Sequence, residues 1–378
     1  MAYTQVPVGL RPTIWAKQSW RQITYQNPIG TLLNSGAVFR PKEFQGLNQP
    51  GQNLVYAYTG RITGPGVGRG GTMVGNEKAL DIGSFQMRFD VVRQAVNNPN
   101  EDTVEVAETD YDFEMESRLA LTDWHNRQIG WSIFNQLAGN NATTMTLDGT
   151  TYTGSTLAQV TGSNDIVAPS ASRIIRPGSV ANDQSLTAAN RMSLQMIDYA
   201  VELLRNSPQQ IGTLNNGSLG QLWISQEQYT DLKQDTDSPI QWYINAQAIA
   251  AGGDDSMLTG KGMYSTSPVM KPVGWYAGVE IYVTPYISYG VNSSNNAQIT
   301  TVRRAVLIGR DALSYASKTG TGRSTDQNVP IVFKEQLQDY AYYKGIEGRR
   351  ILGIKKNTPS NGIDIGVVVI PTYAAAHV

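Results

Sequence analysis

Histidine and cysteine, on which most metal sites and nucleophilic active sites depend, are scarce in this chain. It contains two histidines, His125 and His377, and no cysteine. A Ser-His-Asp triad needs a histidine held between two partners, and zinc sites combine several histidine or cysteine ligands. The sequence therefore argues against both kinds of site. We predict that His125, which falls inside a long helix, lies on the surface or at an interface of that helix.

Acidic and glycine-rich segments also lack the spacing that ligand sites require. Asp231, Asp235 and Asp237 lie close together, but without the glycine and the terminal glutamate of an EF-hand calcium loop. The glycine-rich run at residues 64–71 lacks the Gly-Lys-Ser/Thr ending of a phosphate-binding loop, and a strand rather than a helix follows it. We therefore predict that the protein is not an enzyme, with no catalytic residue, no cofactor and no bound metal ion.

Composition and charge restrict the partners that the chain can bind. Its 378 residues include 30 basic and 31 acidic side chains, so that the formal net charge is -1. Such a balance supplies no field that would draw the chain onto nucleic acid or an anionic membrane. The N-terminus lacks the order of a signal peptide, and no run of about 18 apolar residues occurs. We expect a soluble protein without a membrane partner and without sequence-specific DNA binding.

A long helix at residues 109–139 is the element around which we expect the rest of the chain to be arranged. Thr109 can cap its N-terminus, acidic residues follow in its first turns, and Gly139 suits its C-terminal end. Apolar residues recur at helical spacing and predict one buried stripe. The stripe consists of Phe113, Ala120, Trp124, Trp131, Phe134 and Ala138, and we predict packing contacts for its four aromatic residues. Such a helix would be roughly 45 Å long at about 1.5 Å per residue.

A long hairpin precedes this helix. Strand-like runs at residues 54–63 and 84–96 flank a glycine-rich tip, and alternating apolar residues in the second run favour a two-faced antiparallel ribbon. A ribbon of this kind has too little core to be stable alone, so a neighbouring chain must complete its burial. Arg61, Arg69 and Lys78 could contact acidic groups on that chain, or could simply be solvated.

The first 52 residues read as an arm rather than a domain. Five prolines interrupt them, and only residues 13–26 have helix-like spacing. Apolar side chains such as Trp15 and Trp20 would find burial against other surfaces of the same chain or of a neighbour. Both tryptophans are therefore candidates for contacts between subunits.

The remainder of the chain reads as a mixed α/β unit followed by returning strands. The segment at residues 140–187 is polar, with short strand candidates at 145–147 and 174–175. A helix at 188–205 has an apolar face of Leu194, Ile197, Val201 and Leu204, and should lie against a sheet. Further helices are predicted after Ser225 and after Ser238, with a helical turn at 310–317. Strands are predicted at 222–224, 279–283, 302–308, 332–337, 350–356 and 363–370.

The order of these elements, together with several short motifs, resembles the major capsid proteins of tailed double-stranded DNA phages with the Hong Kong 97-type fold. The resemblance covers nearly the whole chain and is nearest to the branch typified by the capsid protein of the phage called N-four. The residues that carry it are Gly75-Asn76-Glu77, Leu121-Thr122-Asp123-Trp124, Phe134-Asn135-Gln136-Leu137-Ala138-Gly139, Glu335, Asp339-Tyr340, Gly353-Ile354-Lys355-Lys356 and Asp364-Ile365-Gly366. The sequence departs from the family pattern at Tyr340-Ala341-Tyr342, where Gly-Asn commonly follows the tyrosine, and in the polar segment 140–187.

This resemblance implies an α+β capsid fold divided into five parts. They are an N-terminal arm (1–52), an extended loop formed by a long β-hairpin (53–97), a peripheral domain (98–187) with a spine helix at 109–139, an axial domain (188–325) and returning strands of the peripheral domain (326–378). The extended loop would reach across a neighbouring subunit. Glu77, in the hairpin motif, joins Arg61, Arg69, Lys78, Trp15 and Trp20 as a candidate for contacts between subunits.

The resemblance also implies the function. The chain would assemble with itself into hexamers and pentamers of an icosahedral phage head that encloses double-stranded DNA, in the virion. Portal proteins and scaffolding or cement proteins would be its further partners. An encapsulin-like shell of a cellular compartment is the alternative with the same fold, and a glycan hydrolase with two catalytic carboxylates is the alternative from another class.

Overall fold

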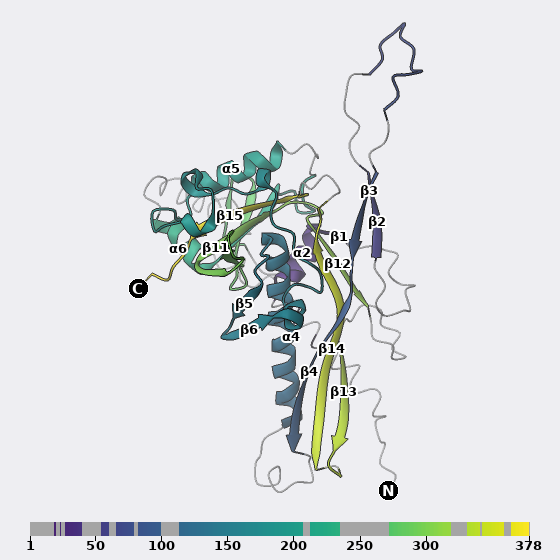
Figure 1. Ribbon diagram of the computed structural model, residues 1–378, viewed down its shortest axis with the longest axis vertical. Coiled ribbons are helices and arrows are strands. Elements are labelled where there is room, and N and C mark those ends of the chain that lie inside the picture. The colour runs from purple at the N-terminus through teal and green to yellow at the C-terminus, as the bar shows by residue number, and fades with distance from the viewer. Residues whose placement is uncertain are drawn as a thin grey trace, which may run out of the picture.

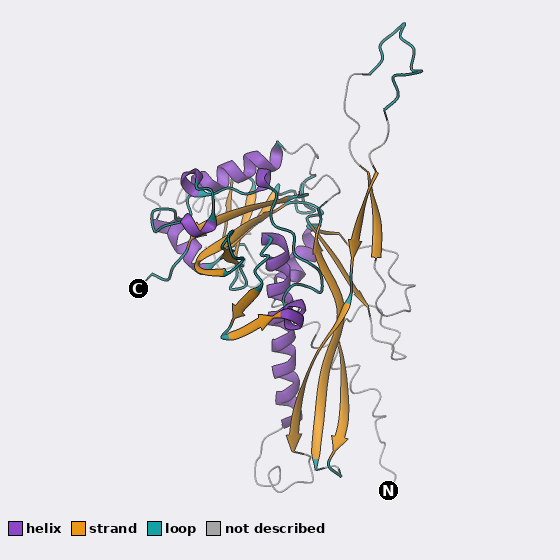
Figure 2. Ribbon diagram, in the orientation of Figure 1, coloured by secondary structure: helices purple, strands orange, loops and turns teal. Residues whose placement is uncertain are grey.

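A computed structural model of the chain shows a mixed α+β fold with two main sheets, a long helix that contacts both, and a separate hairpin (Figures 1 and 2). The α+β class predicted from the sequence is therefore confirmed. The structure describes Ser19, Ile23 and residues 27–39, 54–59, 66–78, 82–99, 113–206, 212–234, 272–318, 331–340, 342–358 and 364–377.

The first sheet has five strands and is built around the long strand β14. Its order is β1-β12-β14-β13, and β4 pairs with the edge of β14 opposite to β13. The strands are β1 (Val38–Phe39), β4 (Asp90–Pro99), β12 (Leu313–Lys318), β13 (Ile331–Gln338) and β14 (Tyr343–Lys356). β4, β12 and β13 run antiparallel to β14. The strands predicted at 332–337 and 350–356 are confirmed, and β14 begins earlier than expected.

The second sheet has six strands in the order β10-β11-β7-β9-β8, with β15 paired to β11. The strands are β7 (Gly220–Ile224), β8 (Gly274–Tyr276), β9 (Val279–Val283), β10 (Tyr289–Val291), β11 (Gln298–Ile308) and β15 (Val367–Tyr373). The strands predicted at 222–224, 279–283 and 302–308 are confirmed. The strand predicted at 363–370 is displaced toward the C-terminus, because its first residues lie outside β15.

Two helices, α5 (Leu194–Arg205) and α6 (Gln226–Gln234), lie over the outer face of this second sheet (Figure 1). The predicted apolar face of α5 is buried and packs against β15, as expected. α5 begins at Leu194 rather than at residue 188, with Ser193 at the N-cap position. The predicted cap of α6 is also confirmed, because Ser225 N donates to Gln228 Oε1 at 3.0 Å and Gln228 N donates to Ser225 Oγ at 3.4 Å.

The long helix α4 spans Phe113–Ala138 and ends at Gly139, as predicted. Gly139 adopts a φ of 62°, Gly139 N donates to Gln136 O at 3.2 Å, and Asn140 N donates to Asn135 O at 3.0 Å. This pair of hydrogen bonds is the Schellman arrangement, which favours glycine at the position with positive φ. The predicted N-terminal cap at Thr109 lies outside the described residues.

The burial of α4 differs from the predicted stripe in its first half. Ala120 is exposed and Trp124 is half-buried, whereas His125 is fully buried, so of the two positions predicted for His125, surface or interface, the surface position was wrong. The reason is that β14 covers the neighbouring helix face, which carries Leu121 and His125. From Gln128 onward every residue of α4 is buried, because this half of the helix also contacts β11 and β15 of the second sheet.

One hydrophobic core therefore runs from the first sheet through α4 to the second sheet. It joins residues of the first sheet, of α4 and of the second sheet in one cluster. Among its members are Ile346, Leu352 and Ile354 from β14, Ile133, Phe134 and Leu137 from α4, and Val306 and Ile308 from β11. A second cluster fills the space between the other face of the second sheet and α5. The helix thus packs against both sheets and fixes the position of one relative to the other.

The hairpin consists of β2 (Leu54–Thr59) and β3 (Ile82–Met87), which pair antiparallel and stand apart from the main sheets (Figure 1). The single strand run predicted at 84–96 is wrong, because it divides at Arg88 and Phe89 into β3 and β4. β3 belongs to the hairpin, whereas β4 pairs with β14 along the first sheet. The chain therefore passes from one sheet to another between the two strands.

Three further differences concern short elements. The predicted helical turn at 310–317 is wrong, because β12 occupies most of it and pairs with β14. Helix α2 (Pro28–Ser35) was not predicted. In the polar segment, β5 (Thr144–Leu147) pairs with β6 (Thr150–Thr153), which confirms the strand at 145–147, and Ile174 forms an isolated bridge to Val369. The segment also holds the 3-10 turns η2 (Gly154–Gln159), η3 (Ala171–Arg173), η4 (Pro177–Ser179) and η5 (Asp183–Ser185).

No helix in the described part of the chain combines the length and the hydrophobicity needed to cross a membrane.

Candidate assembly surfaces

The described residues offer no constellation of catalytic or metal-binding groups. A pocket of about 350 Å³ lies beside β5 and η2, but its lining contains a single carboxylate, that of Asp165, and no histidine. Acid–base catalysis by two carboxylates needs both groups in one site. No group of three or more histidine, aspartate or glutamate side chains that could hold a metal ion occurs among the described residues.

Asp231, the first of the three clustered aspartates, forms an ion pair with Arg191 and also contacts His377. Its Oδ1 lies 2.8 Å from Arg191 Nη1 and 3.0 Å from His377 Nε2. Burial raises the pKa of the Asp231 carboxyl group, and Arg191 opposes this shift. Asp235 and Asp237 lie outside the described residues. Asp231 therefore links α6 to the C-terminal segment that follows β15.

The tip of the hairpin, residues 66–78, projects furthest from the rest of the molecule (Figure 1). Two turns shape it, closed by hydrogen bonds from Gly71 N to Gly68 O at 3.0 Å and from Asn76 N to Met73 O at 2.9 Å. The second turn needs glycine because Gly75 has a φ of 85°. It presents Met73, 59% exposed, and Val74, 84% exposed, to solvent. The tip thus consists of two hydrogen-bonded turns, the second of which exposes two apolar side chains.

Of the residues predicted to contact neighbouring subunits, three lie together on this tip. Arg69, Glu77 and Lys78 are all exposed there. The Glu77 carboxylate also stabilises the turn, because its Oε2 accepts a hydrogen bond from Gly75 N at 2.7 Å. The other three candidates, Arg61, Trp15 and Trp20, lie outside the described residues. Met73 and Val74 were not predicted, although two apolar residues within a glycine-rich loop were a usable signal.

The predicted packing residues of the helix divide into two groups. Trp131 and Phe134 are buried, whereas Phe113 and Trp124 are half-buried. Trp131 packs edge-on against Tyr286, with ring centroids 5.5 Å apart, and Phe134 packs against Trp223 at 5.6 Å. Trp124 instead borders the buried His125, with ring centroids 4.9 Å apart.

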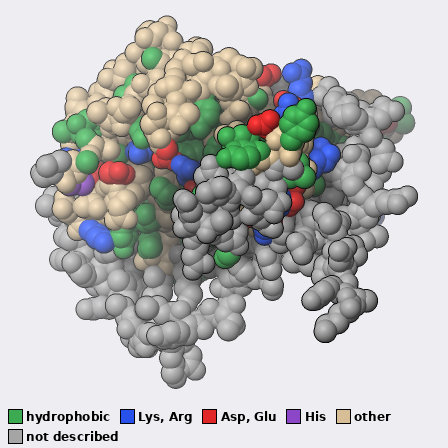
Figure 3. Space-filling view, turned by 90° about the horizontal axis from the view of Figure 1, so that it is seen from below, with side chains coloured by type: hydrophobic (Ala, Val, Ile, Leu, Met, Phe, Trp, Pro, Cys, Tyr) green, Lys and Arg blue, Asp and Glu red, His purple; other side chains and the backbone are tan. Residues whose placement is uncertain are grey.

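Large apolar side chains are also exposed at the opposite end of the molecule, here called the lower surface, where α4 begins and β13 turns into β14. The view of this end in Figure 3 shows hydrophobic side chains exposed among acidic and basic ones. The large exposed side chains of this lower surface are Met115, Leu119, Leu337, Tyr340, Tyr342 and Tyr343. Tyr340 is completely exposed and adopts a φ of 51° in the turn. This turn departs from the pattern of the family that the sequence resembles, but an exposed surface was not predicted there.

Ion pairs beside the lower surface join the N-terminal end of α4 to the first sheet. Lys344 Nζ lies 2.6 Å from Glu114 Oε2 and 3.2 Å from Glu335 Oε2. Glu114 also pairs with Arg118, one helical turn away. The three elements α4, β13 and β14 are thereby tied together next to the exposed tyrosines.

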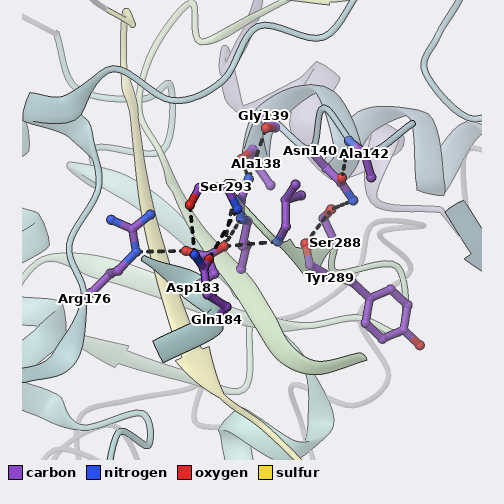
Figure 4. Close-up of polar contacts among 12 residues, drawn as sticks. Ala138, Gly139, Asn140, Ala142, Arg176, Asp183, Gln184, Ser288, Tyr289 and Ser293 are labelled. Carbon is purple, nitrogen blue, oxygen red and sulfur yellow. Dashed lines mark hydrogen bonds and ion pairs between the residues drawn. The ribbon is translucent and has the colours of Figure 1, made fainter. Parts of the chain in front are cut away.

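A buried ionic network joins the other end of α4 to the second sheet (Figure 4). Asp183, in η5, accepts a hydrogen bond from Arg176 Nε at 2.8 Å and lies 2.7 Å from Arg304 Nη2. Arg304, in β11, also donates to the carbonyl oxygens of Ala138 and Gly139 at 3.2 and 3.0 Å. A helix leaves such carbonyl groups unpaired at its C-terminal end, where positive charge is favourable. Arg304 therefore fixes the helix end to the sheet.

Burial lowers the pKa of the Arg304 guanidinium, and the Asp183 carboxylate acts in the opposite direction. A neutral chain of hydrogen bonds runs alongside this pair. Asn140 Nδ2 donates to Ser288 Oγ at 2.8 Å, and Ser288 Oγ donates to Asn135 Oδ1 at 2.9 Å. Asn135 and Asn140, at the end of α4, thus hold the residue that precedes β10 of the second sheet.

Comparison with known proteins identifies the fold. Residues 37–376 match the family described as phage capsid protein. The capsid of Ralstonia phage GP4 superposes with a TM-score of 0.66 at 19% sequence identity, covering 90% of this chain and 88% of that chain. The Cyanophage Pam1 capsid has a TM-score of 0.61 at 17% identity, covering 91% of this chain and 90% of that chain.

The head structure of Helicobacter pylori bacteriophage KHP40 has a TM-score of 0.57 at 15% identity and covers 93% of this chain and 92% of that chain. A comparison with curated proteins found no match. At these identities the structural likeness establishes the fold, which is the capsid fold of tailed phages expected from the sequence.

Proposed function

The chain belongs to the phage capsid protein family, and from this premise we propose that it is the major capsid protein of a tailed double-stranded DNA phage. It is a structural component of the virion capsid, and its family is not a class of enzymes. The proposal is that copies of the chain assemble into the hexamers and pentamers of an icosahedral head that encloses DNA. The match over residues 37–376 is the observation that carries it.

The two exposed apolar surfaces support assembly from identical subunits. The hairpin tip and the lower surface lie at opposite ends of the molecule, so one copy can present each of them to a different neighbour (Figure 1). Contacts between unlike surfaces of identical subunits generate rings when the rotation closes. Apolar side chains that remain exposed in a folded subunit commonly mark such interaction surfaces.

The parts of the subunit would have separate roles in the shell. The hairpin is the extended loop that reaches across a neighbour, and α4 is the spine of the peripheral domain. The second sheet with α5 and α6 forms the axial domain near the centre of each capsomer. The returning strands that follow the axial domain in the sequence are β13, β14 and β15. Of these, β13 and β14 complete the first sheet. Because β4 lies in the first sheet, we place the end of the extended loop at Met87.

Charge supports a shell that encloses DNA without binding its sequence. The formal net charge of -1 gives the subunit no general attraction to phosphate, and DNA affinity depends mainly on cationic contacts with phosphates. We further propose a place in the N-four-like branch of the family, with portal and scaffolding or cement proteins as partners in the head.

Electron microscopy of the purified chain, combined with an assay for nuclease-protected DNA in shells isolated from infected cells, tests this function. We expect closed shells of uniform diameter that protect double-stranded DNA and carry one portal-bearing vertex. A monomer at all concentrations would contradict the proposal. Shells that contain a cargo enzyme and lack both DNA and a portal would instead identify an encapsulin-like compartment.

A further inference from the structure

The hairpin leaves the first sheet at a very close crossing of two backbone segments. Arg88 and Phe89, which separate β3 from β4, pass directly over Gly353 in β14. A Cβ atom at Gly353 would lie 2.4 Å from Arg88 O and 3.1 Å from Phe89 Cδ1. Backbone atoms cannot yield at such distances as a flexible side chain can. Glycine at position 353 is therefore required for the crossing.

The side chain of Asn164 forms hydrogen bonds to the backbone at the same crossing. Its Oδ1 accepts a hydrogen bond from Arg88 N at 2.8 Å, and its Nδ2 lies 3.1 Å from Arg88 O. Nδ2 also contacts Gly162 O at 3.0 Å and Ile354 O at 3.1 Å. One amide group, 6% exposed, therefore engages both backbone groups of Arg88 and binds that residue to β14.

Lys355, the residue after Ile354 in β14, makes a second contact between β14 and the hairpin. Its Nζ donates to Gln86 O at 2.7 Å and lies 4.9 Å from the centroid of the Phe85 ring. Both contacts fall on β3, in the hairpin itself. Beneath them, Leu54, Phe85 and Met87 pack against Ala316 of β12 in a small apolar cluster.

The loop that carries Asn164 is itself fixed to the long helix. Gln136 Nε2 donates to Thr161 O at 2.6 Å and to Asn164 O at 3.0 Å. Ile354 N donates to Gly162 O at 3.0 Å, which secures the loop to β14. Gly162 has a φ of 67°, and a Cβ atom there would lie 2.6 Å from Ile354 Cβ. Hydrogen bonds to α4 and to β14 therefore both fix the position of this loop.

We propose that Asn164, Gly353 and Lys355 form a hairpin clamp that sets the angle between the hairpin and the first sheet, and thereby the geometry of assembly. A two-stranded ribbon is weakly stable alone, so its direction must be fixed at its root. A small rotation at the root becomes a large displacement at the tip, and a closed shell requires the same rotation in every copy. The clamp rests on the proposed function of the hairpin as a contact between subunits.

The clamp also gives a role to motifs that carried the family resemblance without an assigned contact. Gln136 comes from the motif at the end of α4, and Gly353 and Lys355 come from the motif in β14. Asn164 lies in the polar segment from which few elements were predicted. These residues meet at one point because α4, β14 and the loop at 161–164 pack together there.

Distance measurement between two spin labels tests the clamp in the full-length, unassembled subunit. Because the chain has no cysteine, single cysteines can replace Val74 on the hairpin tip and Arg93 on β4, both of which are exposed. The distribution of label distances is compared among the parent chain, Asn164→Ala and Lys355→Ala. Gln228→Ala is the matched control, since Gln228 is a buried amide with several hydrogen bonds in the second sheet.

We expect a broader or shifted label distance in Asn164→Ala, a smaller change in the same sense in Lys355→Ala, and the parent distribution in Gln228→Ala. Without the labels, Asn164→Ala should form shells of irregular diameter or open sheets. A parent-like distance distribution in both clamp variants, or shells of normal diameter from Asn164→Ala, would overturn the clamp. If Asn164→Ala does not fold, Lys355→Ala alone decides, because its side chain lies nearer the surface. Failure of the parent chain to form shells would count against the proposed function, and the label distances would still test the clamp.

Discussion

At the scale of single residues, a histidine and an arginine buried together between α4 and β14 show how the subunit uses polar groups in its core. Arg350 Nη1 donates to His125 O at 2.8 Å and lies 3.3 Å from His125 Nδ1. Burial lowers the pKa of Arg350 to about 9, so the guanidinium is charged at neutral pH. Burial and the adjacent guanidinium lower the pKa of His125 well below its usual range. The structure therefore requires a neutral imidazole.

This arrangement predicts that the folded subunit loses stability in mild acid. The unfolded chain binds a proton at His125 with a pKa of about 6.5, whereas the folded chain does not until the pH is much lower. The unfolded state therefore takes up more protons as the pH falls below about 6.5, and the free energy of unfolding decreases. Thermal unfolding measured between about pH 7.5 and about pH 5 brackets this range.

The control for this prediction is the other histidine. His377→Ala should retain the decrease in melting temperature with falling pH, whereas His125→Gln should show a weaker dependence on pH over the same range. An equal dependence in the parent chain and in His125→Gln would assign the effect to other groups.

At the scale of elements, α4 shows why periodicity predicts a helix better than it predicts the buried face. The apolar stripe assumed one covering surface, but the second half of α4 is buried on all sides. Polar residues are tolerated there because they are hydrogen-bonded: Ser132 Oγ contacts Gln159 O at 3.1 Å and Asn135 Nδ2 donates to Val160 O at 3.0 Å. These partners lie in the polar segment, whose structure has no periodic signal in the sequence.

The difference between the two halves of α4 predicts different costs for losing an aromatic side chain. Phe134→Ala should reduce the free energy of unfolding by about 3–5 kcal/mol, because Phe134 is fully buried and a cavity would remain. Trp124→Ala should cost less, because Trp124 is half-buried and the cavity would open to solvent. Chemical denaturation of the unassembled subunit measures both values. An equal or larger loss in Trp124→Ala would show that the first half of the helix is covered as closely as the second.

Elements with local signals could be predicted from the sequence, and elements defined by distant partners could not. α5, β7, β9 and the end of α4 follow from periodicity and from Gly139. β12 was predicted as a helical turn because its strand conformation depends on pairing with β14, which is distant in the sequence. α2 could have been predicted, since Asn27 caps it, Pro28 occupies its first turn and Gly36 follows it with a φ of 82°. The division of β3 from β4 depends on the crossing over Gly353, for which no local pattern exists.

At the scale of the whole molecule, the structure is a packed centre with exposed apolar side chains at each end. The core that runs through α4 fixes the two sheets, and the ionic network at Arg304 secures the helix to the second sheet. The hairpin projects from this centre, and all but one of the tip residues 66–78 are exposed. The candidate contact residues Arg69, Glu77 and Lys78 lie where a neighbouring copy can reach them. Loops that project in this way contribute little to the stability of their own subunit.

The most direct test of the central claim is electron microscopy of a chain that lacks residues 66–78. Because those residues are exposed and bonded only to one another in the described structure, the shortened subunit should unfold at the same temperature as the parent chain. A milder variant, Met73→Ser with Val74→Ser, should assemble only at a higher protein concentration than the parent chain. We predict a folded subunit that forms no closed shells when residues 66–78 are removed; regular shells of parental diameter from that subunit would contradict the account.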